Sequence, residues 1–61
     1  MKVHIEITCN NEAFEPSAGL EVASILRKMA SYAEQYGLVK GTCDRYPDYN
    51  GNFVATCRVS E

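Results

Sequence analysis

The chain has 61 residues, a formal net charge of −2 and 46% hydrophobic residues, so we expect a single globular domain, 1–61, rather than a disordered chain. A domain of this size buries only about 60% of its unfolded surface, so it is marginally stable without a partner, a metal or a disulfide. The mild acidity disfavours a nucleic-acid binder, because such proteins usually carry a basic excess.

The first element is a predicted strand over residues 2–9, where polar and apolar side chains alternate. Val3, Ile5, Ile7 and Cys9 share one face, which we expect to lie against a helix. This alternation is typical of a strand and not of a signal peptide, and no apolar run approaches the roughly 20 residues that span a bilayer. We therefore expect a cytoplasmic protein with no membrane segment.

Residues 10–16 form a connection, and the only large apolar side chain in it is that of Phe14. Asn10 and Asn11 are typical turn residues because their side chains bond nearby backbone groups. We expect Phe14 to close the open end of the core. The alternative is that Phe14 is exposed and anchors a partner.

A single helix is predicted from Ser17 to Gly37, with Ser17 as the N-cap and Gly37 as a left-handed C-cap. Apolar residues recur at helical spacing in one stripe: Val22, Ile25, Leu26, Met29, Ala33 and Tyr36. We expect Val22, Leu26 and Met29 to make the central core contacts. Tyr36 is expected to line the core with its hydroxyl group at the surface.

Two further strands are predicted over residues 42–46 and 53–60, joined by a hairpin that contains Asn50-Gly51. A two-residue loop would place Cys57 opposite Asp44. A three-residue loop with Gly51 left-handed would place Cys57 opposite Cys43, and a shift of one residue turns every side chain over. We prefer the three-residue loop, which puts both cysteines on the inner face and Asp44 outside.

The order strand, helix, strand, strand predicts an α+β fold, βαββ, with one helix packed on a three-stranded, mainly antiparallel sheet. The last strand is the most evenly apolar and is therefore expected in the middle. The alternative is that the first two strands pair in parallel through a right-handed crossover.

No constellation of residues for chemistry is visible. His4 and the cysteines Cys9, Cys43 and Cys57 form no Cys-x-x-Cys pair, so we expect reduced thiols and neither a metal nor another cofactor. The carboxylates are scattered and are expected to be solvated. We therefore predict no catalytic, cofactor-binding or metal-binding residue and a protein that is not an enzyme.

Four tyrosines in so short a chain indicate a binding surface, because tyrosine buries a large area at low entropic cost. The predicted partner-binding residues are Phe14, Tyr32, Tyr46, Tyr49 and Asn50. A homodimer is also expected, formed by edge pairing of strands or by packing around Tyr32, because such a domain gains stability from a partner.

The segments 5–15 and 21–27, followed by Asn50-Gly51-Asn52, resemble short proteins of tailed bacteriophages and prophages, most of which have no assigned function. The resemblance covers most of the chain but departs from it in the cysteines and the longer hairpin tip. It implies a phage protein in the host cytoplasm that binds and inhibits or modulates a host protein, for example a defence component such as a CRISPR effector. It supplies no catalytic residue.

A nucleic-acid-associated phage accessory protein is the alternative function. Lys2, Lys40, Arg45 and Arg58 can gather on the strands, with Tyr46 as a stacking residue. Two carboxylates, those of Glu6 and Asp44, are expected to share that surface and weaken it, so a nucleic-acid partner is disfavoured.

Overall fold

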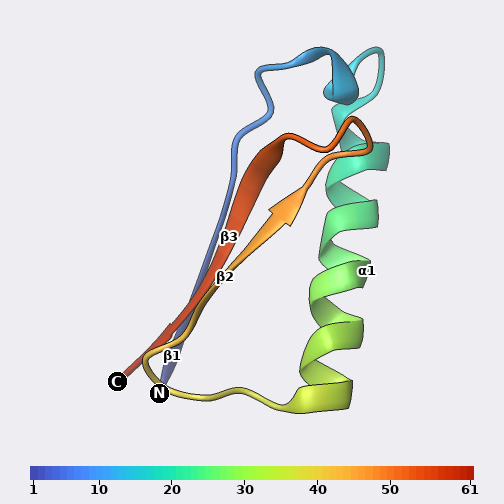
Figure 1. Ribbon diagram of the computed structural model, residues 1–61. Coiled ribbons are helices and arrows are strands. Elements are labelled where there is room, and N and C mark those ends of the chain that lie inside the picture. Colours follow the sequence, from blue (N-terminus) through green and yellow to red (C-terminus); the bar gives the residue numbers. More distant parts are fainter.

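The computed structural model describes all residues, 1–61, and confirms the expected α+β fold (Figure 1). The elements are β1 (Lys2–Ile7), the short 3₁₀ helix η1 (Glu12–Phe14), α1 (Ala18–Tyr36), β2 (Cys43–Pro47) and β3 (Phe53–Ser60). The strands form one antiparallel sheet in the order β1-β3-β2. The expected central position of the last strand is confirmed, and the parallel crossover is wrong.

Helix α1 covers one face of the sheet but diverges from it along its length. The helix and sheet meet beside η1 and the hairpin tip and separate toward the C-terminal end of α1 (Figure 1). The core therefore gathers at the closed end, in a cluster of Ala13, Phe14, Ile25, Met29 and Ala55. Neither this helix nor any other part of the chain has the helical length and apolarity needed to cross a membrane.

The apolar stripe of α1 is confirmed, with Met29 in the core and Val22 packed against it, but the prediction of Leu26 as a core residue is wrong. Ile25 is 0% exposed and Met29 is buried, whereas Leu26 is 42% exposed and Tyr36 is also exposed. Phe14 of η1 packs in the same cluster as Ile25 and so closes the core on that side of the helix. Because the C-terminal half of α1 stands away from the sheet, Tyr36 has no core to line.

The hairpin tip has the expected three-residue loop, Tyr49-Asn50-Gly51. The Asp48 N–H donates to the Asn52 carbonyl oxygen at 2.9 Å, and the Gly51 N–H donates to the Asp48 carbonyl oxygen at 3.0 Å. Gly51 has a φ of 88°, in the left-handed region that a side chain disfavours.

Beyond the tip, a β-bulge overturns the register expected for the cysteines. Pro47 pairs with Phe53 but Tyr46 pairs with Ala55, so β3 has one additional residue, Val54, at this point. Past the bulge Asp44 pairs with Cys57, and Cys43 pairs with Arg58. The expected Cys43–Cys57 pairing is therefore wrong, and the two thiols belong to opposite faces.

The bulge also exchanges which side chains face the helix. Asp44 lies on the inner face, with Cys57, instead of outside. Phe53 lies on the outer face, where the guanidinium carbon of Arg45 is 4.7 Å from the centre of its ring. One additional residue thus moves a negative charge inward and an aromatic ring outward.

Candidate functional site

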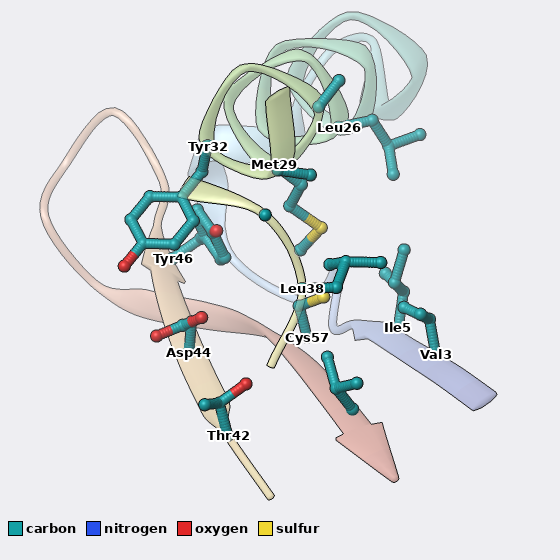
Figure 2. Close-up of a pocket in the computed structure, with 14 residues that line it drawn as sticks. Val3, Ile5, Leu26, Met29, Tyr32, Leu38, Thr42, Asp44, Tyr46 and Cys57 are labelled. Atoms are coloured by element: carbon teal, nitrogen blue, oxygen red, sulfur yellow. The ribbon is translucent and has the colours of Figure 1, made fainter. Parts of the chain in front are cut away.

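The divergence of α1 from the sheet leaves a cavity of about 260 Å³ between them, which we call the apolar cleft. It is lined by 14 residues, 11 of them hydrophobic, from α1, the following linker and all three strands. Figure 2 shows Leu26 and Met29 extending from the helix toward Ile5 and Leu38. The cleft is therefore built mainly from side chains that a larger protein would bury in its core.

Several of these apolar side chains are in contact with water. Val3 is 45% exposed and Ile5 is 44% exposed, and Leu26 and Leu38 are exposed to a similar degree. Single exposed apolar residues need no explanation, but a contiguous exposed patch marks an interaction site. In this cleft the four side chains belong to one continuous surface.

One wall of the apolar cleft is polar. Asp44 and Tyr46 lie on β2, and Cys57 lies beside Asp44 on the neighbouring strand β3, on the same face of the sheet (Figure 2). Burial raises the pKa of the Tyr46 hydroxyl above its usual range, and the neighbouring Asp44 carboxylate raises it further. Burial and then Asp44 raise the pKa of the Cys57 thiol in the same way. Asp44 forms no ion pair within the chain, so it is a free negative charge beside apolar surface.

The closed end of the molecule is held by the carboxylate of Asp48, which is only 3% exposed. One oxygen, Oδ1, accepts the backbone N–H of Asn50 at 2.8 Å and that of Asn52 at 3.0 Å. The other, Oδ2, accepts the side-chain amide of Asn11 at 2.8 Å. Burial alone would raise the pKa of Asp48, but these hydrogen bonds, together with the side chain of Asn52, outweigh burial and lower it.

These bonds connect the hairpin tip to the two helices. Asn11 also caps η1, because its side-chain oxygen accepts the Ala13 N–H at 3.0 Å. The Tyr49 N–H donates to Glu21 of α1 at 2.9 Å. The expectation that all carboxylates are solvated is wrong for Asp48, whose side chain organises this end of the fold.

The five predicted partner-binding residues do not form one surface. Tyr32 and Tyr46 line the apolar cleft, whereas Tyr49 and Asn50 are exposed at the hairpin tip. Phe14 is 3% exposed and packs in the core, so it closes the core and offers no anchor to a partner. The structure therefore divides the candidates between the cleft and the tip.

The residues that make the cleft distinctive are not predicted from the sequence. The sequence predicts Leu26 in the core and Asp44 on the outer face, and it predicts no surface for Leu38. No local signal identifies the exposure of Leu26, because it depends on the divergence of α1 from the sheet. No local signal identifies Asp44, because its face depends on the bulge at Val54.

The outer face of the sheet is polar and mainly basic, whereas the cleft is mainly apolar. It carries Lys2, Arg45 and Arg58 beside His4, and Glu6 is its one carboxylate. Tyr46 and Asp44 belong to the cleft instead, and Lys40 pairs with Glu61. The expected dilution of this basic surface by Asp44 is therefore wrong.

No group of three or more His, Cys, Asp or Glu side chains gathers where it could hold a metal ion, and all three cysteines are free. Comparison with protein-family models, curated proteins and solved structures found no match to this chain.

Proposed function

We propose that this protein is a small, non-enzymatic protein-binding module and that the apolar cleft is its binding site. The observation that carries the proposal is the exposure of Val3, Ile5, Leu26 and Leu38 on one continuous surface. Burying each such side chain completely is worth about 1.5–3 kcal/mol, so covering the half-exposed set supplies a substantial part of a binding energy.

The occupant that fits the cleft is an amphipathic segment of another protein, with an apolar face and one basic side chain. The volume of about 260 Å³ holds one or two inserted side chains and is small for a drug-sized ligand. The free Asp44 carboxylate complements a lysine or arginine at the edge of the inserted face. An apolar helix laid into a groove is a recurring mode of peptide recognition.

The polar groups of this cleft do not favour a catalytic role. Tyr46 and Cys57, the neighbours of Asp44, have raised pKa values and are therefore protonated at neutral pH. A protonated thiol is a poor nucleophile, because the thiolate is the reactive form. The polar wall thus supplies hydrogen bonds and one charge, which suits recognition.

The resemblance to phage proteins extends the proposal to a host protein as the partner, with inhibition or modulation as the outcome. Residues 5–15 and 21–27, on which the resemblance rests, include Ile5 and Leu26 of the cleft. A host defence component, such as a CRISPR effector, is one partner of this kind. The protein would then act in the cytoplasm of the bacterial host.

The test compares capture of bacterial proteins by the wild type and by two leucine variants of the same helix. Leu26→Glu places a charge in the apolar cleft, and the matched control Leu20→Glu changes an exposed leucine outside it. We expect a partner that is captured by the wild type and the control but lost with Leu26→Glu.

With that partner purified, binding should shift the backbone NMR signals of cleft residues, and Asp44→Asn should weaken binding about tenfold. Equal capture by Leu26→Glu would show that the partner binds elsewhere. Signal changes confined to Tyr49 and Asn50 would assign binding to the hairpin tip instead.

Binding of single-stranded nucleic acid by the outer sheet face is the second candidate function. One observation favours it: the bulge removes Asp44 from that face and places exposed Phe53 there beside Arg45. Aromatic side chains stack with bases, and cations contact phosphates.

A salt titration with a labelled oligothymidine separates this function from protein binding. Three phosphate contacts predict a slope of about −2 for log affinity against log salt concentration. Arg58→Gln should weaken binding, and Arg27→Gln on the helix should not. An affinity that is independent of salt would exclude phosphate recognition.

A further inference from the structure

Strand β1 has a free edge, where its backbone groups have no neighbouring strand. Because β3 is central, β1 and β2 are the two edges of the sheet. Strand β2 has five residues, ends at Pro47 and lies beside the bulge, all features that discourage pairing with another chain. Strand β1 has six residues, KVHIEI, with no proline, glycine or bulge.

The backbone groups on this edge can be assigned from the register. The Thr8 N–H donates to the Val54 carbonyl oxygen at 2.8 Å, so the even-numbered residues of β1 point their backbone groups toward β3. The backbone groups of Val3, Ile5 and Ile7 therefore point to the free edge. The inner-face side chains of Val3 and Ile5 are nearly half exposed at the same edge.

We propose that a second copy of this chain pairs with the free edge of β1, antiparallel, about a two-fold axis at His4. In this register the hydrogen-bonded pairs are Val3 with the partner's Ile5 and Ile5 with the partner's Val3. Both residues are odd-numbered, as the backbone directions require. The two sheets become one sheet of six strands, and both helices lie on the same face.

The charges select this register. Lys2 and Glu6 lie two residues on either side of His4 on the outer face, so a two-fold axis at His4 places Lys2 of each copy opposite Glu6 of the other. Charged residues on an edge strand usually block pairing. Here the opposite signs at equal distances from His4 make the edge complementary to itself, and opposite-charge cross-strand pairs are stabilising.

On the inner face, the same pairing brings two copies of Val3 and two of Ile5 together. This dimer places the exposed Val3 and Ile5 side chains of the two copies next to each other, so the two apolar clefts lie beside each other on one sheet and stay open on the helix side. It requires no other protein, so it goes beyond the proposed function and can be tested without knowing the partner.

Charge exchange tests the dimer and its register together. Sedimentation equilibrium of the wild type, from low micromolar to millimolar concentration, should show a transition from 6.8 kDa to twice that mass. Lys2→Glu and Glu6→Lys should each weaken dimerisation roughly 10- to 100-fold, because two attractive pairs become repulsive by symmetry. The double variant Lys2→Glu/Glu6→Lys should restore it.

The controls Lys28→Glu and Glu34→Lys make the same charge changes on exposed positions of α1 and should leave the dimer unchanged. Circular dichroism verifies that each variant is folded. A monomer mass for the wild type at every concentration would overturn the proposal. If the single exchanges leave the dimerisation affinity unchanged, or if the double exchange does not restore it, the two-fold axis at His4 is wrong.

Discussion

Replacing Ile25 by alanine should destabilise the fold far more than the same change at the next residue, Leu26. Ile25 is completely buried in the cluster with Phe14 and Met29, and its truncation leaves a cavity. Such substitutions cost about 2–5 kcal/mol. At about 0.05–0.15 kcal/mol per residue, a chain of 61 residues has a total stability of about 3–9 kcal/mol, so Ile25→Ala removes a large part of it.

For Leu26→Ala the expected cost is about 1 kcal/mol. The side chain is 42% exposed, so part of the transfer free energy is never gained, and truncation widens an open cleft instead of leaving an enclosed cavity. Alanine is also at least as good a helix former as leucine.

Urea unfolding, followed by far-ultraviolet circular dichroism, measures both free energies of unfolding at a protein concentration where the chain is monomeric. Equal slopes against urea concentration permit direct comparison of the variants. A cost for Leu26→Ala equal to or above that of Ile25→Ala would refute this reasoning, since it would mean that Leu26 is buried at least as completely as Ile25.

Three further predictions concern the tip and the thiols. The fold lowers the pKa of Asp48, so the ionised carboxylate stabilises the protein above about pH 4, its pKa in the unfolded chain, and this stabilisation is lost as pH falls through the folded pKa. Asp48→Asn should therefore lower the free energy of unfolding at pH 7, measured with urea, and wild type and variant should become equally stable in acid. A maleimide should label exposed Cys43 faster than Cys57, whose pKa burial raises, and mass spectrometry without reductant should detect no bond between them; such a bond would contradict the register. Gly51→Ala should lower stability by about 1 kcal/mol because φ is 88°, whereas helical Gly19→Ala should raise it by up to about 1 kcal/mol, both read from thermal unfolding.

The elements of this fold follow from local rules, which is why the sequence predicts them. Alternation marks β1 and β3, helical spacing marks α1, and Asn50-Gly51 marks the hairpin with its three-residue loop. Even the strand order follows, since the most apolar strand is the central one.

The candidate site depends on features that no local rule provides. The bulge at Val54 reverses which face Asp44 occupies, and the residue sequence of β3 does not predict this bulge. Likewise, the exposure of Leu26 depends on how far α1 diverges from the sheet beyond the cluster that contains Phe14. Periodicity predicts that a stripe is apolar; it does not predict how much of the stripe another element covers.

The V-shaped arrangement of α1 and the sheet has a consequence for selectivity. The helix and the sheet diverge toward the C-terminal end of α1, so the cleft is asymmetric along the helix axis. An occupant that enters in one direction therefore makes different contacts from the same segment entered in reverse. This asymmetry selects the direction of the bound segment as well as its sequence.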